Sequence, residues 1–172
     1  MSLVRHFTAT GFVVQSGHTL LHWHPKVRAW LPPGGHVADG EDPVQAVLRE
    51  VLEETGLAVE VVSTGVDARF DYPRQVAPPL TILIEDIDDP VTGLHQHIDM
   101  IYVCRPLAQG APAAAGWLWV SRADLEAATP VSPPAGAPPA PTPAPPPEDV
   151  RVLAMHAFAV EDRAARLAER QP

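Results

Sequence analysis

The chain has 172 residues, the size of one ordinary domain, and 46% of them are apolar, so a single hydrophobic core can form. Its net charge is −9, which argues against a protein that binds along the phosphates of a nucleic acid polymer. No apolar run approaches the roughly 20 residues of a membrane-spanning helix, and no apolar leader opens the chain. Because the lone cysteine, Cys104, cannot form an internal disulfide, we expect a soluble cytoplasmic protein.

The chain is expected to begin with strands. β-branched and aromatic residues from Phe7 to Val14 and a second extended stretch from Thr19 to His24 flank a Ser16-Gly17 turn, which predicts a hairpin. The following Leu31-Pro32-Pro33-Gly34-Gly35 segment is expected to be a loop without regular structure.

A helix is predicted from about Pro43 to Thr55. Asp42 has the character of an N-cap, with proline next and Gln45 as its capping-box partner, and Gly56 supplies a stop. Strands are then expected at Ala58–Ser63, Leu80–Ile84, Ile98–Cys104 and Trp117–Val120, before a short helix capped by Ser121 and Asp124. The order of strands, helix, strands and helix predicts an α+β or mixed-sheet fold rather than a repeating βαβ chain.

Proline is the compositional outlier, and ten of the 21 prolines lie between Pro130 and Pro147. That stretch lacks apolar periodicity, so we expect a semi-rigid linker or loop at 130–147. It would join a body at 1–129 to a C-terminal helix at 148–172, which could dock on the body through Val150, Leu153, Phe158 and Val160.

Three carboxylates share one face of the predicted Pro43–Thr55 helix. Glu50, Glu53 and Glu54 stand at i, i+3 and i+4, and Arg49 can neutralise only part of their charge. A solvated acidic face is one interpretation. The other is a site for a hard divalent cation such as Mg²⁺, which takes oxygen ligands and leaves positions for phosphate.

The residues around these glutamates favour the second interpretation. The segment GHVADGEDPVQAVLREVLEETGL fills every specified position of the Nudix box, and the chain therefore resembles the Nudix hydrolases. The resemblance implies an α/β/α sandwich with a central mixed β-sheet. It also implies Mg²⁺- or Mn²⁺-dependent hydrolysis of a nucleoside diphosphate linked to another moiety. The matching positions are Gly35, Glu41, Arg49, Glu50, Val51, Glu53, Glu54, Gly56 and Leu57.

The resemblance also implies roles for individual residues. Glu50 and Glu54 would be the principal metal ligands, with Glu53 as a further ligand or as the base for the attacking water. The Gly34 carbonyl would complete the metal site, and Arg49 would orient the glutamates. Gly35, Glu41 and Gly56 would support the loop and the helix. The base for the attacking water could instead lie outside the helix, and the candidates are Glu85, Asp86, Asp88, Asp89 and Asp99.

Substrate contacts are expected just before the box and on a later strand. Lys26 or Arg28 could meet phosphate, and Trp23 or Trp30 could stack on a base. His95, His97 and Asp99 alternate along a strand and so share one face, where a cleft-lining role that includes His97 is favoured over a transition-metal site.

The leading interpretation is therefore a metal-dependent pyrophosphohydrolase that acts on a small nucleotide and not on a nucleic acid polymer or a membrane. A homodimer is compatible with this interpretation. The alternative is a Nudix-like module that senses a nucleotide or binds a partner, with weak or no hydrolysis.

Overall fold

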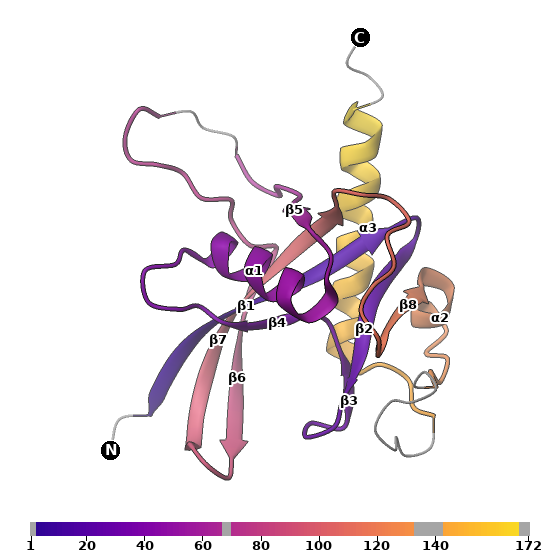
Figure 1. Ribbon diagram of the computed structural model, residues 1–172, viewed down its shortest axis with the longest axis horizontal. Helices are drawn as coiled ribbons and strands as arrows, with labels where there is room; N and C mark the ends of the chain where they lie inside the picture. Colours follow the sequence, from indigo (N-terminus) through magenta and orange to yellow (C-terminus); the bar gives the residue numbers. More distant parts are fainter. Residues whose placement is uncertain (1–2, 67–69, 133–142, 169–172) are drawn as a thin grey trace.

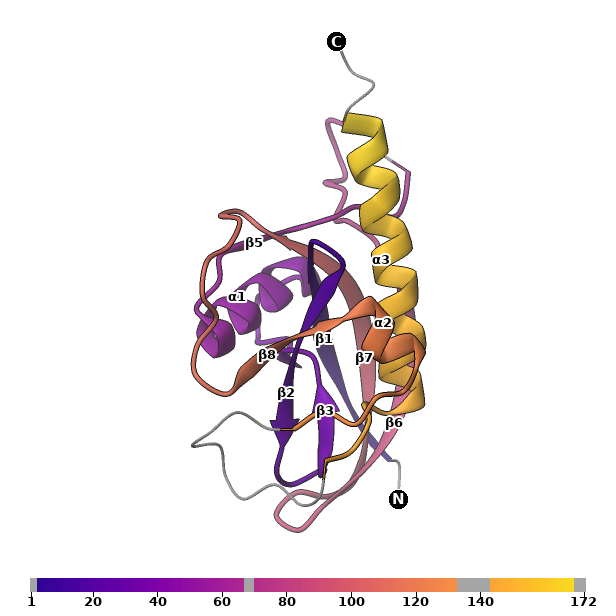
Figure 2. The ribbon, with the colours of Figure 1, turned by 90° about the vertical axis from the view of Figure 1, so that its right-hand side faces the viewer.

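The computed structural model describes residues 3–66, 70–132 and 143–168. A mixed β-sheet forms the middle layer, with one helix on one face and two helices on the other (Figures 1 and 2). This arrangement confirms the predicted α/β/α sandwich. Within the described residues, no helix is both long and apolar enough to cross a membrane.

Two long strands form the centre of the sheet. β1 (Val4–Gln15) and β7 (Gly93–Pro106) run parallel, with Val4 beside His95 and Val13 beside Cys104. The remaining pairings are antiparallel, so the sheet is mixed. The other strands are β2 (His18–His24), β3 (Ala29–Leu31), β4 (Gly34–His36), β5 (Val59–Val61), β6 (Thr81–Asp89) and β8 (Trp117–Ser121).

Helix α1 (Pro43–Thr55) begins and ends where its caps predict. The Asp42 carboxylate accepts hydrogen bonds from the Val44 and Gln45 amides, while the Gln45 side chain accepts one from the Asp42 amide. Gly56 adopts φ +73°, the left-handed conformation that ends a helix at little cost to glycine. These caps fix which residues of α1 face the sheet.

The central strands are buried on both faces, and alternate side chains enter two separate cores. On β7, Tyr102 and Cys104 pack under α1, whereas Ile101 and Val103 pack under α3. The Cys104 thiol is fully buried, and burial raises its pKa to about 12, which makes it a core residue.

Helix α3 (Glu148–Ala168) completes the second core together with α2 (Arg122–Glu126). Phe158 is 1% exposed, and the Arg122 guanidinium lies over its ring at 4.8 Å from the centroid. Most of the predicted proline-rich linker lies outside the described residues, but its two ends meet where the Val131 amide donates to the Ala144 carbonyl.

The structure differs from the expected extended segments in two respects. The predicted loop contains β4, which pairs with β1 from Thr8 to Thr10. Glycine permits this pairing, because a Cβ on Gly34 would lie 2.7 Å from the Thr10 hydroxyl oxygen. β6 and β7 extend several residues beyond the predicted stretches, because their polar ends continue to pair from Glu85 opposite His97 to Asp89 opposite Gly93.

Candidate active site

Arg49 organises the acidic face of α1. Its guanidinium donates two hydrogen bonds to Glu41, at 2.8 and 2.9 Å, and one each to Glu50 at 2.8 Å and Glu53 at 3.2 Å. A further hydrogen bond reaches the His36 carbonyl at 3.1 Å. The donors of Arg49 are therefore committed to the loop and to two of the glutamates, in the forked geometry that only arginine provides.

Glu54 is the third glutamate on this face of α1, and Arg49 donates its hydrogen bonds to Glu41, Glu50 and Glu53 instead. Within the described residues, the hydrogen bond to its carboxylate comes from the Gly34 amide at 3.1 Å. Burial raises the pKa of Glu54, and the negative charges of Glu50 and Glu53 raise it further. The Glu54 main-chain carbonyl is fixed from the other side by the Trp117 indole N–H at 2.8 Å.

Gly35 forms a cradle for Glu50. A Cβ at this position would lie 2.5 to 2.8 Å from the three heavy atoms of the Glu50 carboxylate group. The absence of a side chain at Gly35 therefore lets the carboxylate lie directly against strand β4. Together Gly34 and Gly35 bring the backbone of β4 to two of the three glutamates on α1, Glu54 and Glu50.

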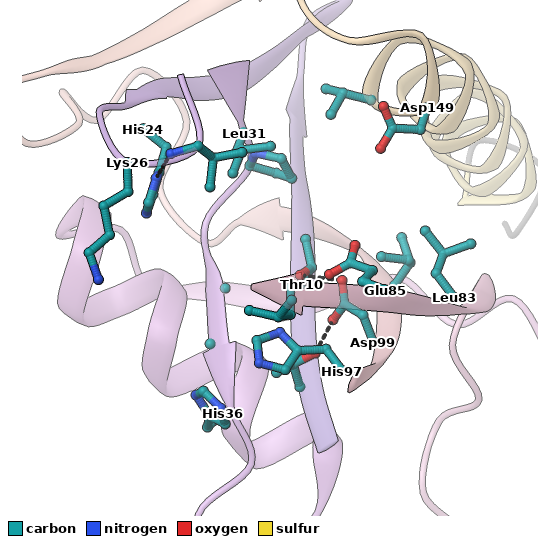
Figure 3. Close-up of a pocket in the computed structure, with 18 of the residues that line it drawn as sticks. Thr10, His24, Lys26, Leu31, His36, Leu83, Glu85, His97, Asp99 and Asp149 are labelled. Carbon is teal, nitrogen blue, oxygen red and sulfur yellow. Dashed lines mark hydrogen bonds between the residues drawn. The ribbon is translucent and has the colours of Figure 1, made fainter. Parts of the chain in front are cut away.

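A cleft of about 790 Å³ opens beside Glu54, between β1, the β6–β7 strands, the turn after β2 and the start of α3 (Figure 3). Its size lies within the range of small-molecule sites. Apolar side chains contribute to its lining, among them Phe12, Leu31, Leu83, Ile87 and Leu153.

Two further carboxylates face each other inside the cleft. Asp99 on β7 accepts hydrogen bonds from the hydroxyls of Thr8 at 2.9 Å and Thr10 at 2.8 Å, and Glu85 on β6 lies beside it (Figure 3). Burial, Asp99 and Asp149 raise the pKa of Glu85 to about 7, and burial also raises the pKa of Asp99. The cleft therefore holds a carboxyl group that titrates near neutrality.

Basic and aromatic groups lie on the side formed by β2. Lys26 lines the cleft and pairs with Asp89 at 3.2 Å, and this pair joins the turn after β2 to the end of β6. His22 also lines the cleft, and its ring lies 4.3 Å from that of Trp117 between centroids. Burial lowers the pKa of His22 to about 4, with a smaller effect from His24, so the ring is neutral at pH 7.

Several expected substrate contacts take different positions. Trp30 is fully buried and packs edge-to-face on Trp23, so it offers no open ring face for stacking, and the expectation that it binds substrate is wrong. Arg28 lies in the turn between β2 and β3, with φ +56°, and is not among the cleft-lining residues. Lys26 and His97 do line the cleft, as does Gly35.

Some of the box residues line the cleft and others do not. Glu54, Gly34 and Gly35 line the cleft, Glu50 lies behind Gly35, and Glu53 is 61% exposed on the outer side of Arg49. All of the acids named as alternative bases also line it, because β6 and the adjoining part of β7 form one of its walls.

Sequence reasoning missed Thr8 and Thr10 on β1 and Asp149 on α3. The two threonines stand two apart on a strand, which puts them on one face, and this spacing was the available signal. Asp149 had no such signal, because only the docking of α3 brings its carboxylate to the cleft (Figure 3).

The residues present fit a hard divalent cation. The donors around Gly34 are carboxylate oxygens, which Mg²⁺ and Mn²⁺ prefer. Glu54 is half-buried, carries an elevated pKa and lies beside two other negative charges. A cation at this point would compensate charge that Arg49, already bonded elsewhere, leaves uncompensated.

Known proteins are similar to this chain in sequence. The chain is 43% identical over 54 residues to the RNA pyrophosphohydrolase of Dinoroseobacter shibae, which is 29% of this chain and 34% of that protein. It is 30% identical over 84 residues to the asymmetrical bis(5'-nucleosyl)-tetraphosphatase of Rattus norvegicus, which is 45% of this chain and 57% of that protein. The matches thus span about a third to just over half of these curated relatives.

The structural match extends further. A crystal structure of a NUDIX-family hydrolase from Clostridium perfringens aligns with a TM-score of 0.68 and 26% identity, over 92% of this chain and 99% of that one. A family model described as NUDIX domain matches residues 4–141, a stretch that includes both the box helix and most of the cleft-lining strands. Because this match spans most of the chain, the chain belongs to the Nudix hydrolase family.

Proposed function

We propose that the protein is a Mg²⁺- or Mn²⁺-dependent pyrophosphohydrolase that cleaves a nucleoside diphosphate linked to another moiety. The observation that carries the proposal is the half-buried Glu54 carboxylate at the edge of the cleft. It is bonded to a neutral amide of Gly34 and surrounded by the charges of Glu50 and Glu53. Such a group favours a cation, and a cation is what an acidic protein needs in order to hold an anionic substrate.

Glu50 and Glu54 would hold the metal, with Glu53 and the Gly34 carbonyl as further ligands. When bound, the cation supplies positive charge to the phosphate oxygens and lowers the pKa of the attacking water. Arg49 fixes the directions of the Glu50 and Glu53 carboxylates through hydrogen bonds of 2.8 and 3.2 Å. Glu41 in turn holds Arg49, so it acts through the arginine and not on substrate.

The cleft suits a nucleotide. Its apolar lining, which includes Phe12, Leu31 and Leu153, could accept a nucleobase, while Lys26 and His97 could contact polar groups. The relatives are named for RNA and dinucleoside tetraphosphate substrates. The net charge of −9 disfavours long contacts with a polymer, and we therefore propose a small nucleotide.

Two carboxylates are proposed acceptors of the water proton, Glu53 on the box helix and Glu85 in the cleft. A pH profile of kcat separates them. If Glu85 accepts the proton, kcat rises with pH through about 7, the pKa of Glu85, and the Glu85→Gln variant loses this limb. If Glu53 accepts it, Glu85→Gln retains the wild-type profile and Glu53→Gln loses activity.

The experiment is a substrate panel assayed with Mg²⁺ and with chelator. It includes nucleoside triphosphates, ADP-ribose, nucleotide sugars, dinucleoside polyphosphates and a 5'-triphosphorylated RNA oligonucleotide. We expect metal-dependent turnover of a small nucleotide and weaker turnover of the RNA. Turnover that persists in chelator would contradict the metal, and preferred turnover of the RNA would contradict the substrate class. Nucleotide binding with no turnover would support a sensing module instead.

A further inference from the structure

Four histidines from three adjacent strands gather at one end of the sheet. His6 lies on β1, His36 on β4, and His95 and His97 on β7, where the β1–β7 register places His6 beside His97. Their ring centroids are 4.9 Å apart for His36 and His97, 5.0 Å for His6 and His95, and 5.1 Å for His95 and His97. Two of them, His36 and His97, line the cleft (Figure 3). The proposed hydrolysis uses His97 only as a substrate contact and leaves the rest of the cluster unexplained.

Two nitrogen separations in this group have the length found between ligands of a tetrahedral metal ion. The Nε2 atoms of His95 and His97 lie 3.3 Å apart, and so do Nε2 of His36 and Nδ1 of His6. Ligands bonded to zinc at about 2.05 Å in a tetrahedron are separated by about 3.3 Å. One ligand nitrogen from each of His6, His95 and His97 lies within 4.8 Å of the other two. Small rotations of the rings would therefore suffice to bring three donors to one ion.

His95 has the outer hydrogen bond typical of a metal-binding histidine. Its Nδ1 lies 2.8 Å from the Gly93 carbonyl oxygen, which can only accept, so Nδ1 carries the proton. In the neutral ring, the lone pair of His95 is then on Nε2, which lies 3.3 Å from Nε2 of His97. A backbone carbonyl that fixes the tautomer and the ring direction in this way is the usual outer partner of a metal-bound imidazole. His95 is also 6% exposed, which restricts its movement.

The donor atoms point to a different class of ion from the one proposed at α1. Imidazole nitrogens are common ligands of transition metals, whereas a hard cation such as Mg²⁺ prefers oxygen. Because the donors are nitrogens, the cluster differs from the oxygen donors of Glu50 and Glu54 and suits a different class of ion.

We propose that His6, His95 and His97 bind a borderline transition-metal ion of the Zn²⁺ class, with His36 or water as the fourth ligand. The ion would link β1 to β7. With His36 as the fourth ligand, it would also restrain β4 next to Gly35. It is separate from the oxygen-ligand site on α1, and its occupancy does not depend on the proposed hydrolysis. Binding should raise the melting temperature of the protein, because the ion binds the folded state.

Binding is tested on the full chain, stripped of metal, by titration with Zn²⁺ and by the visible spectrum with Co²⁺. We expect one equivalent of Zn²⁺ to bind in a large excess of Mg²⁺, an intense four-coordinate cobalt band, and a higher melting temperature. His6→Ala, at a half-exposed position, should weaken binding at least tenfold. His95→Ala, at a buried position, should do the same provided its circular dichroism spectrum remains that of the wild type.

The matched controls separate this site from its alternatives. His18→Ala removes an exposed histidine outside the cluster and should leave Zn²⁺ affinity unchanged. The Glu50→Gln/Glu54→Gln double variant should keep the cobalt band, because its changes are at the oxygen donors. The proposal is overturned if His6→Ala binds Zn²⁺ like the wild type, or if the double variant loses the band.

Discussion

The Arg49 guanidinium donates two hydrogen bonds, of 2.8 and 2.9 Å, to the Glu41 carboxylate, and this pair joins the loop before α1 to the middle of the helix. The hydrogen bonds from Arg49 lower the pKa of Glu41 to about 2, so the pair stays charged throughout the neutral range. The same guanidinium orients Glu50, so the loop and a proposed metal ligand are coupled through one side chain.

Replacing Arg49 with lysine should therefore reduce activity although the charge is kept. An ammonium group cannot hold Glu41 in a fork and also reach Glu50 and Glu53. We expect kcat to fall at least ~10-fold, on the scale of a lost charged hydrogen bond, while KM for the nucleotide changes little. The test is to measure steady-state kinetics of Arg49→Lys, with Arg151→Lys on α3 as the control. Equal losses in the two variants would argue against an orienting role.

Gly35→Ala tests whether the close approach of Glu50 to β4 matters. The added Cβ would lie 2.5 Å from a Glu50 carboxylate oxygen, so the flexible side chain must move away. We expect weaker Mg²⁺ activation and a lower kcat, with a melting temperature close to that of the wild type. An unchanged Mg²⁺ dependence would show that the position of Glu50 is not critical.

Glu85 should make stability fall as pH rises. The pKa of this carboxyl group is about 7 in the folded protein against an ordinary value of 4.5, so the folded state keeps a proton that the unfolded chain has lost. The stabilising effect of this proton is complete below about pH 4.5 and is lost as pH rises through about 7.

Glu85→Gln should match the wild type near pH 4 and exceed its free energy of unfolding at pH 8 by on the order of 1–2 kcal/mol, after allowance for solvent screening. Urea unfolding at both pH values measures this difference. The exposed Glu126→Gln substitution on α2 serves as the control, and identical pH slopes in all three proteins would contradict the assignment.

Phe158→Ala tests whether α3 is part of the folded core. The ring is 1% exposed between the sheet and Arg122, so its removal should cost about 3–5 kcal/mol of the free energy of unfolding. Leu167→Ala, on the same helix but 58% exposed, should cost less than about 1 kcal/mol. Similar losses in both variants would mean that α3 is not held by this contact.

The sequence predicted the features that depend on local patterns. The bounds of α1 follow from the Asp42 cap and Gly56, and the acidic face follows from helical spacing of Glu50, Glu53 and Glu54. The family resemblance supplied the layer order, which the sheet and the helices confirm.

The contacts that the sequence did not predict are long-range. Trp30 looks like a site residue because it precedes the glycine loop. Strand pairing, however, directs its side chain into the core, where it packs on Trp23. The histidine cluster depends on the parallel register of β1 and β7, which brings His6 to His97 across 91 positions, and no local spacing encodes that register. Asp149 reaches the cleft only because α3 docks there.

The central claim is that Glu54 holds a catalytic divalent cation. The most direct measurement is the initial rate of the best nucleotide substrate as a function of Mg²⁺ concentration, for the wild type, Glu54→Gln and Glu126→Gln. We expect Glu54→Gln to lose at least ~100-fold in rate at saturating Mg²⁺ and to need more metal for half-maximal rate, while it keeps the wild-type melting temperature. Glu126→Gln should behave like the wild type. A Glu54→Gln variant that retains the full rate and the wild-type Mg²⁺ dependence would contradict the account.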